Sequence, residues 1–439
     1  MITLDDIRDS LEGAVPGVTS TCSPEGVPNV CYISQVEYVD PEHVALSFQF
    51  FNKTRQNVLA NPQATVAVVD AESAAVHRLM LAYLRTETAG PLFERMKAKL
   101  ASIANATGMA EVFRLRGADV YRVERIELMS GTVLPKAPRR NSLAAVRATS
   151  DALARARDLG QLIDQLLDCL GRYFGIEHAM VLAIDRAGDR FYTLASRGYG
   201  SSGVGAEIPL GVGTVGTAAA MRVPIRLAHA ASEYAYVRGI RETAARDPLW
   251  ASRLELAIPF PGLPNPHSQL AVPIELEDTV LGVLYVESAE QRRFTHDDED
   301  ALVTLARQVA LALRGYEGEE AVPASLPAST PAGQPLAVKY FPENGSLFFD
   351  EEYVIRGVAG AICWKLLKVF QEEGRTEFSN RELRLDRSLG LPELSDNLEA
   401  RLLLLERRLR EKSAGVLLER TRRGRFTLRV ERSLQLSGA

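Results

Sequence analysis

Alternating apolar and polar positions mark two strand-like runs near the start of this chain, VALSFQF at residues 44–50 and ATVAVVD at residues 64–70. A short polar turn and a helix separate them. Residues 91–105 place Phe93, Met96, Leu100 and Ile103 at helical spacing, and a further strand, GADVYRVERIEL, follows. Residues 74–90 fit a strand or a helix equally well. The pattern predicts a β-rich first module with an inserted helix.

A different pattern begins after residue 141. Leucines and isoleucines recur every three or four positions from Ser142 to Phe174, which predicts one long amphipathic helix. Two strands, a glycine-rich connector and two further strands lead to a closing helix. Thr295, followed by Asp298 and Glu299, is a good start for that helix, because carboxylates there complement its dipole. The predicted module is a compact α+β domain.

The last hundred residues predict a hairpin, a helix, a short helix, a longer helix and a second, basic hairpin. Asn344-Gly345 is the strongest short hairpin signal in the chain. A helix is expected from Val358 to Glu373, and a longer one begins at Ser395. Its unbroken leucines at 402–405 indicate a helix that is buried on more than one side, as in a dimer interface.

Two breaks divide the chain. Residues 134–141 form a basic, proline-containing linker, and residues 315–335 are rich in Pro, Ala, Glu and Ser with no periodic apolar face. The expected domains are residues 1–133, 142–314 and 336–439, with 315–335 as a linker. A chain of 439 residues with 46% hydrophobic and 24% charged content can bury a core in each of them.

Composition and charge indicate the cellular compartment and where a polyanion could bind. No apolar run is long enough to span a membrane, and the first residues are acidic and polar, so we expect a cytoplasmic protein without a membrane partner. The formal net charge is −5. Residues 375–432 carry 15 Lys+Arg and 10 Asp+Glu, or +5, which leaves −10 for the remainder. The C-terminal end is therefore the part of the chain with a net positive charge.

The four cysteines lack zinc-ligand spacing, and we expect no metal site built on them. Cys22 and Cys31 lie on either side of a Pro-Glu-Gly turn, where they could face each other across a hairpin as a redox pair or serve as small buried side chains.

The candidate chemistry lies in the polar turn of the first module. Lys53, Thr54 and Arg55 place two cations and a hydroxyl at a strand-to-helix junction, which suits a phosphate monoester. A solvated loop would have the same composition.

This first module resembles the FMN-binding split β-barrel family related to pyridoxamine 5'-phosphate oxidase. The carriers are the strand that ends at VALSF, the Lys-Thr-Arg cluster, Asn57 and the Asn61-Pro62 pair. The resemblance implies that FMN is held by residues of this turn and its strand, and that the flavin site is completed in a homodimer. The implied cofactor-binding residues are Ser47, Lys53, Thr54, Arg55 and Asn57. A barrel that has lost its flavin is the alternative.

Three features, the segment LAVPIELEDTVLGVLYVES, the closing helix and the GVGTVG turn, make residues 142–314 resemble the GAF family of small-molecule sensor domains. The resemblance implies a small-molecule ligand or a ligand-free dimerisation unit. His229 and His267 lie on the segments that wall such a pocket, so haem ligation is an alternative to their being ordinary loop histidines.

The C-terminal region resembles a winged helix in outline. The resemblance implies a partner that is DNA or another protein, with the longer helix in the major groove. Candidate nucleic-acid contacts are Arg401, Arg408, Arg422, Arg423 and Arg425. Glu399 and Glu406 on the same helix oppose this, because phosphate would repel them.

Two functions remain open from the sequence. The first is a flavin-binding redox or small-molecule sensor in which the barrel and GAF domains control a winged-helix output, which could be transcriptional. The second is an FMN-dependent oxidoreductase of the pyridoxamine phosphate oxidase-like class, regulated by its GAF domain, although no catalytic acid or base stands out. A scaffold with empty sensor folds is the plainer alternative.

Overall fold

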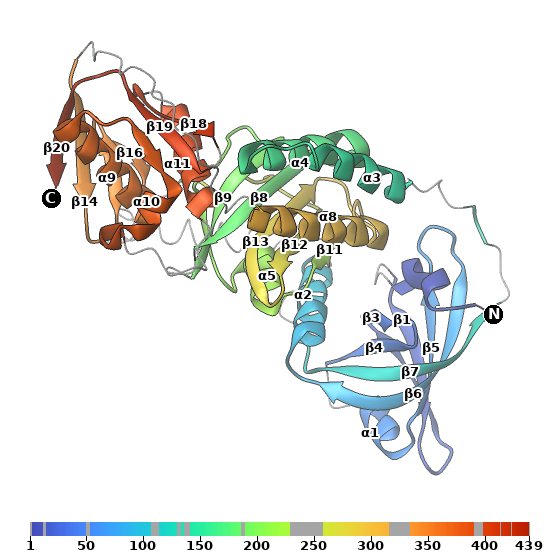
Figure 1. The fold of residues 1–439 in the computed structure, drawn as a ribbon. Coiled ribbons are helices and arrows are strands. Elements are labelled where there is room, and N and C mark those ends of the chain that lie inside the picture. The colour runs from blue at the N-terminus through green and yellow to red at the C-terminus, as the bar shows by residue number, and fades with distance from the viewer. Residues whose placement is uncertain are drawn as a thin grey trace.

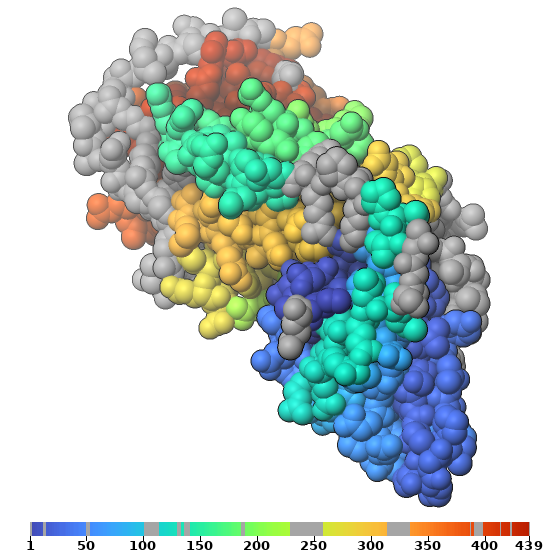
Figure 2. Space-filling model, turned by 90° about the vertical axis from the view of Figure 1, so that its right-hand side faces the viewer, coloured from blue at the N-terminus to red at the C-terminus, as the bar shows by residue number. Residues whose placement is uncertain are grey.

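The computed structural model describes residues 2–11, 15–49, 53–106, 114–129, 133–135, 141–185, 189–228, 258–315, 334–389, 398–412, 414–422 and 424–438. Its three domains follow one another along the molecule, with the N-terminus in the first and the C-terminus at the far end of the third (Figure 1). A space-filling view shows the same order, from the blue first domain to the red last one (Figure 2). The protein is therefore multidomain.

The first domain is a seven-stranded antiparallel sheet in the order β2-β1-β5-β6-β7-β4-β3. Its core includes four fully buried side chains, Val44, Val66, Leu79 and Leu81. Its strands are Gly17–Cys22 (β1), Pro28–Ile33 (β2), Val36–Asp40 (β3), His43–Phe48 (β4), Gln63–Val69 (β5), Val76–Glu87 (β6) and Gly117–Leu128 (β7). Its helices are the 3-10 helix Asp5–Leu11 (η1), Lys53–Ala60 (α1) and Pro91–Ala106 (α2).

The expected strands and the inserted helix of this domain are confirmed, and the ambiguous segment is the long strand β6. The redox pair that Cys22 and Cys31 could have formed is not present. In the β1–β2 hairpin Cys31 is opposite Thr19, while Cys22 is opposite Pro28, so the register sets the two thiols apart along the strands. Both cysteines are free.

The second domain is a six-stranded antiparallel sheet in the order β10-β9-β8-β13-β12-β11. In the view of Figure 1, α3, α4 and α8 lie on one side of it and α5 on the other. The strands are His178–Asp185 (β8), Arg190–Arg197 (β9), Glu207–Pro209 (β10), Ile225–Leu227 (β11), Ser268–Leu276 (β12) and Thr279–Ser288 (β13). The helices are Ser142–Leu153 (α3), Leu159–Phe174 (α4), Gly213–Met221 (α5) and His296–Gly315 (α8).

The prediction of a single helix from Ser142 to Phe174 is wrong, because the helix is interrupted between the end of α3 at Leu153 and the start of α4 at Leu159. Asp158 is the N-cap of α4, and its side chain accepts a hydrogen bond from the backbone N–H of Gln161. Such a cap starts a new helix at a position where the leucine pattern by itself predicts a continuous one. The predicted cap of α8 is confirmed, since Asp298 and Thr295 exchange hydrogen bonds.

The GVGTVG motif opens helix α5 rather than forming a free turn. Gly211 and Gly213 have φ of 79° and 63°, in the left-handed region that glycine tolerates. A Cβ on Gly216 would lie 2.5 Å from the carbonyl oxygen of Pro209. These glycines therefore serve a tight turn and close packing.

The third domain has a four-stranded sheet, β16-β15-β14-β20, and a three-stranded one, β17-β19-β18. The predicted Asn344-Gly345 turn joins β14 to β15. The strands are Leu336–Phe341 (β14), Ser346–Phe349 (β15), Glu352–Ile355 (β16), Glu377–Ser379 (β17), Val416–Arg422 (β18), Arg425–Val430 (β19) and Leu434–Gly438 (β20). The helices are Gly357–Glu373 (α9), Asn380–Leu385 (α10), the 3-10 helix Arg387–Leu389 (η3) and Leu398–Lys412 (α11).

Side chains join the domains to one another. Helix α2 leaves the barrel and reaches β11 and α5 of the second domain (Figure 1), where Ala98 packs against the apolar side chains beneath α5. The cores of the second and third domains form one continuous apolar cluster, from Leu153 to Val430. In the described part of the chain, no helix is long and apolar enough to cross a membrane.

Candidate functional site

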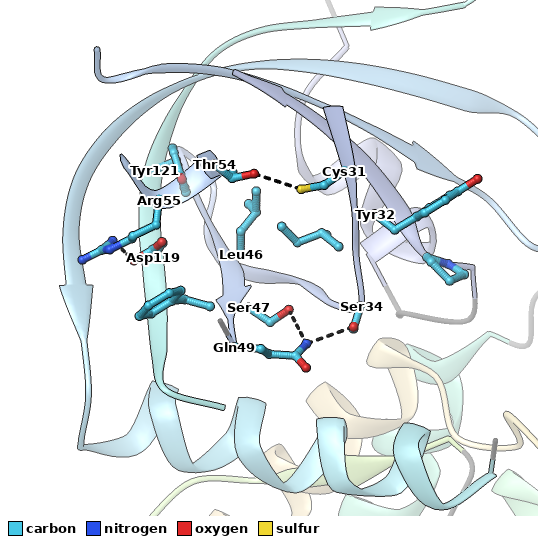
Figure 3. A pocket seen from close by; sticks show the side chains of 13 residues that line it. Cys31, Tyr32, Ser34, Leu46, Ser47, Gln49, Thr54, Arg55, Asp119 and Tyr121 are labelled. Carbon is cyan, nitrogen blue, oxygen red and sulfur yellow. Dashed lines mark hydrogen bonds and ion pairs between the residues drawn. The ribbon is translucent and has the colours of Figure 1, made fainter. Parts of the chain in front are cut away.

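A cavity of about 450 Å³ opens in the barrel domain between β2, β4, β7 and the start of α1. Its walls are mostly apolar, with polar groups at two ends (Figure 3). The lining residues are Pro16, Cys31, Tyr32, Ile33, Ser34, Leu46, Ser47, Phe48, Gln49, Thr54, Arg55, Asp119 and Tyr121. Sequence segments more than a hundred positions apart, from Pro16 to Tyr121, therefore meet around one space.

At one end, Thr54 faces Cys31 across the cavity (Figure 3). The Thr54 hydroxyl lies 3.0 Å from the Cys31 sulfur and accepts a 2.8 Å hydrogen bond from the side-chain amide of Asn29. Thr54 lies in the first turn of α1, where backbone N–H groups and the helix dipole favour an anion. This end can donate hydrogen bonds to a phosphate.

Arg55 lines the same cavity, but a carboxylate holds its guanidinium. Its Nη1 lies 2.5 Å from Oδ1 of Asp119, which also accepts a 2.5 Å hydrogen bond from the Thr86 hydroxyl. The guanidinium stacks over the rings of Phe48 and Tyr83. Burial raises the pKa of Asp119, against the lowering effects of Thr86 and Arg55.

The other end of the cavity carries a polar group built by Gln49. Its side-chain amide donates a 2.9 Å hydrogen bond to the Ser34 hydroxyl and a longer, 3.5 Å one to the Ser47 hydroxyl. Ser47 and Gln49 are 7% and 8% exposed. These side chains offer hydroxyls and an amide to the polar edge of a ligand whose body lies along Leu46 and Ile33.

The predicted cofactor residues fall into two sets. Ser47, Thr54 and Arg55 line the cavity. Lys53 is exposed and is not one of the lining residues, while Asn57 is buried and donates to the Thr21 hydroxyl at 3.1 Å. Asn57 therefore ties α1 to β1, and Lys53 can add only charge from outside the lining.

The cavity fits a flavin nucleotide by the chemistry of its groups. An apolar body suits an aromatic ring system, Gln49 and the serines suit ring carbonyl and N–H groups, and Thr54 with Arg55 and the start of α1 suits a phosphate. Asp119 is the opposing feature, because its charge competes with a phosphate for Arg55. A flavin bound there would supply hydride or electron chemistry.

The structure describes the surroundings of one of the two haem candidates of the second domain. His229 lies outside the described residues. His267 is partly buried, and its backbone N–H donates to the carbonyl of Ser288, which fixes the start of β12. Beneath α5, Glu287 is 1% exposed and accepts hydrogen bonds from the Leu263 N–H and the Tyr285 hydroxyl. Burial raises the pKa of Glu287.

The candidate nucleic-acid residues are divided by the third domain's packing. Arg401 is 3% exposed and pairs with Asp185 of the second domain. Arg408 is 7% exposed and donates to the Val354 carbonyl and to Glu411 within its own domain, so its guanidinium is committed to that fold. Arg425 is exposed at the start of β19. The side chain of Arg422, and Arg423 as a whole, lie outside the described residues.

Sequence reasoning missed the acidic partners that organise both regions. Asp119 and Asp185 lie near the ends of strands and look like ordinary strand residues. Glu37 in β3 was also missed. It is 4% exposed and pairs with Arg95 and Lys99 of α2. An acidic residue at the end of an otherwise apolar strand is the signal that could have marked Asp185. Asp119 lies in a strand with several other charged residues and carries no such signal.

The arrangement defines a protein with a barrel-like domain that contains a cavity, followed by an α+β domain. A family model described as pyridoxamine 5'-phosphate oxidase matches residues 3–127, and one described as GAF domain matches residues 156–314. The chain thus carries an N-terminal domain like pyridoxamine 5'-phosphate oxidase and a GAF domain. No curated protein matches it.

Several solved structures are similar to parts of the chain. The GAF domain of a phosphoenolpyruvate-protein phosphotransferase from Coxiella burnetii is 21% identical, with a TM-score of 0.32, covering 40% of this chain and 94% of that one. An FMN-binding protein from Syntrophomonas wolfei is 19% identical, with a TM-score of 0.24, covering 28% and 88%. A free methionine-R-sulfoxide reductase from Neisseria meningitidis, solved with its substrate, is 16% identical, with a TM-score of 0.30, covering 40% and 91%.

Proposed function

We propose that this protein is a flavin-binding sensor or regulatory protein. In this proposal the barrel cavity holds FMN, the GAF domain holds a small molecule, and the C-terminal domain is a winged-helix output that acts on nucleic acid. The observation that carries the proposal is the buried coupling between domains, since α2 packs into the GAF domain and the GAF and C-terminal domains share one apolar core. Ligand binding in one domain can then bias the next.

The cavity favours a sensory over a catalytic use of the flavin. Its acidic group, Asp119, is held by Arg55 and Thr86, and the Cys31 thiol is bonded to Thr54. An oxidoreductase of the pyridoxamine phosphate oxidase-like class would need a group free to exchange a proton with substrate. The carboxylate of Asp119 and the thiol of Cys31 are both engaged in hydrogen bonds, which supports the sensory use.

The order of elements supports the winged-helix proposal. Helix α9, strand β17, helices α10 and α11, and the β18–β19 hairpin follow one another as in that fold, and β17 pairs with β19 in the hairpin sheet. The output would therefore use α11 and the hairpin that contains Arg425.

We also propose that the barrel pairs with a second copy along β2. This strand is an edge of the sheet, with Val30 65% and Tyr32 81% exposed. Tyr32 lines the cavity, so the wall on that side stands open to whatever covers β2. A second copy would cover the apolar edge and complete the wall.

A titration of the purified chain with FMN, followed by quenching of flavin fluorescence, tests the cofactor part of the proposal. We expect saturation at one FMN per chain, and a weaker affinity for riboflavin because it lacks the phosphate that Thr54 and Arg55 would contact. Absence of saturable binding would overturn the flavin assignment. Steady oxidation of a reduced nicotinamide or of pyridoxamine phosphate by the loaded protein would instead favour the oxidoreductase.

A further inference from the structure

Helix α11 places arginines against carboxylates of the GAF domain. The guanidinium of Arg401 lies 3.0 Å from Oδ1 of Asp185, and the two side chains are 3% and 12% exposed. Arg407 donates to the Leu194 carbonyl at 3.1 Å and to Asp164 at 2.7 Å. All three GAF acceptors are therefore carboxylate or carbonyl oxygens. A guanidinium also binds the anionic oxygens of a phosphate backbone.

A third pair extends this contact beyond α11. Nε of Arg356, at the N-cap of α9, lies 2.9 Å from Oε1 of Glu207 in the short strand β10. The C-terminal domain thus contributes arginines and the GAF domain contributes carboxylates. The excess of basic residues between positions 375 and 432 agrees with this division.

Arg401 and Arg407 both contact the GAF domain, although they do not lie in one row along α11. At 100° per residue they are about 120° apart around the helix axis, so they lie at the two edges of the face that the GAF domain covers. Leu403 itself packs at α4, where a Cβ on Gly160 would lie 3.3 Å from its Cδ1. The GAF domain therefore covers this side with both apolar and charged contacts.

The acidic residues of α11 repel a polyanion little, because arginines of the C-terminal domain neutralise their charge. Glu399 is paired with Arg420 of β18, and Glu406 accepts from Arg410 and Arg420. Glu411 accepts from Arg408. Their charge is offset inside the C-terminal domain, whereas Arg401 and Arg407 are paired across the domain boundary.

We infer that the face of α11 with Arg401 and Arg407 is a polyanion-binding surface, and that Asp164 and Asp185 of the GAF domain occupy it in this structure. The inference rests on the proposed nucleic-acid output and adds its regulation: double-stranded nucleic acid and the GAF domain compete for the same arginines. A GAF ligand that weakens the contact between α11 and the GAF domain would free this surface. Because separation of the two also exposes Leu403 to water, it needs such a ligand to shift the equilibrium.

The experiment uses the full chain and fluorescein-labelled DNA duplexes of mixed sequence, with binding followed by fluorescence anisotropy. The variants are Asp164→Lys, whose native side chain is 64% exposed and so leaves the fold intact, and the double variant Asp164→Lys with Asp185→Lys. The matched control is Asp278→Lys, at a GAF carboxylate that is 97% exposed. Hydrogen exchange of residues 398–412 reports whether α11 is released.

We expect Asp164→Lys to bind DNA more tightly than Asp278→Lys, which changes the net charge by the same amount. The double variant should bind about tenfold more tightly than the unaltered chain, with faster exchange in α11 and a steeper dependence on salt. Adding Arg401→Ala and Arg407→Ala to it should remove the gain. An equal gain in the control would show an effect of net charge alone and overturn the inference. So would unchanged protection of α11 in the double variant.

Two outcomes separate this inference from the proposed function. If the unaltered chain already binds DNA as tightly as the double variant, the competition is wrong but the nucleic-acid output stands. If α11 is released and DNA still does not bind, both the polyanion surface and the nucleic-acid output are overturned, while FMN titration still decides the flavin part.

Discussion

The guanidinium of Arg55 lies 2.5 Å from the carboxylate of Asp119, and both side chains line the barrel cavity. The sequence shows the arginine as part of a cationic cluster, yet the folded cavity contains a nearly neutral pair. Asp119 therefore sets how much positive charge a phosphorylated ligand meets.

Replacing Asp119 by Asn tests this role. We expect Asp119→Asn to tighten FMN binding about threefold to tenfold, because the phosphate no longer competes with a carboxylate for Arg55. Riboflavin affinity should be unchanged, since it carries no phosphate. Fluorescence titration measures both ligands, and an equal gain for riboflavin would show that Asp119 acts on the ring instead.

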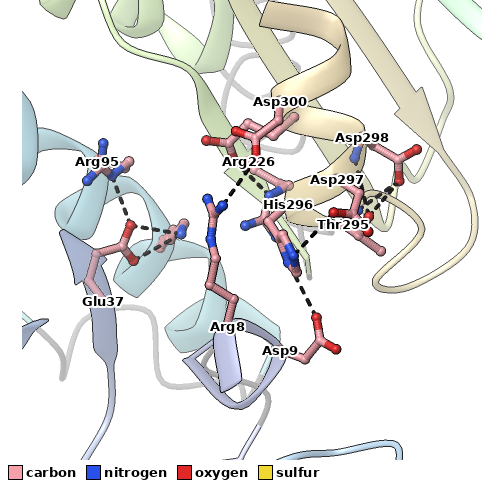
Figure 4. A network of polar contacts seen from close by, with 12 residues as sticks. Arg8, Asp9, Glu37, Arg95, Arg226, Thr295, His296, Asp297, Asp298 and Asp300 are labelled. Carbon is pink, nitrogen blue, oxygen red and sulfur yellow. Dashed lines mark hydrogen bonds and ion pairs between the residues drawn. The ribbon is translucent and has the colours of Figure 1, made fainter. Parts of the chain in front are cut away.

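Glu37 is the second residue whose charge depends on its surroundings. It is buried between α2 and the sheet, and Figure 4 shows it facing Arg95 near the network of Arg226 and His296. Burial opposes its charge, but Lys99 and Arg95 outweigh that effect and lower the pKa of Glu37 from 4.5 to about 2.

This shift predicts a specific acid sensitivity. A carboxyl whose pKa is lower in the folded state stabilises the protein above its unfolded pKa, and that stability is lost as the pH falls from about 4.5 to about 2. The loss amounts to about 3 kcal/mol for Glu37. Chemical denaturation across this range should show it, and Glu37→Gln should flatten the curve, whereas Glu42→Gln at an exposed position should not.

Among the elements, α2 belongs to two domains at once. Leu92 and Met96 pack into the barrel against Ala45, Ala118 and Val120. Ala98 packs against the GAF side chains beneath α5, and Lys99 reaches back to Glu37. The sequence predicted this helix from its apolar spacing, but its second contact depends on where the GAF domain lies.

Placing a charge at Ala98 should separate the two domains. We expect Ala98→Glu to split the thermal unfolding into two transitions, because a buried carboxylate without a partner weakens the contact while the barrel core is intact. Differential scanning calorimetry measures this. Ala60→Glu, at an exposed position of α1, is the matched control, and a single shared transition in both variants would argue against coupling through α2.

Helix α11 shows the same dependence on its neighbours. Its four consecutive leucines are at most 5% exposed, as the sequence indicated. The prediction of burial on several sides is confirmed, but the GAF domain and the C-terminal domain provide that burial within one chain, so the leucines themselves do not call for a dimer interface.

At the scale of the whole molecule, the three domains form a row that is tied together at both boundaries (Figure 2). Arg8 of η1 pairs with Asp300 of α8, and His296 lies 3.3 Å from Asp9 (Figure 4). A change in the barrel therefore has a physical route into the closing helix of the GAF domain. The expected homodimer would add a further contact through β2.

That homodimer can be tested by altering β2 outside the cavity lining. We expect Val30→Glu to convert a dimer into a monomer and to weaken FMN binding, because the open wall beside Tyr32 is no longer covered. Light scattering after size exclusion measures the mass. Val133→Glu, at a valine 49% exposed, is the control, and a dimer that persists in Val30→Glu would place the interface elsewhere.

The sequence by itself determined the elements and the general class. Apolar periodicity gave the barrel strands, α2, α8 and the Asn344-Gly345 hairpin, since these depend on local spacing and turn chemistry. It could not place the break between α3 and α4, where the leucine pattern continues across the Asp158 cap.

Only the tertiary structure decided which charges meet. Arg55 with Asp119 and Arg401 with Asp185 join residues 64 and 216 positions apart, and no local pattern encodes such distances. Burial then gives these pairs their importance, because a charge removed from water depends on its nearest partner far more than on its sequence neighbours.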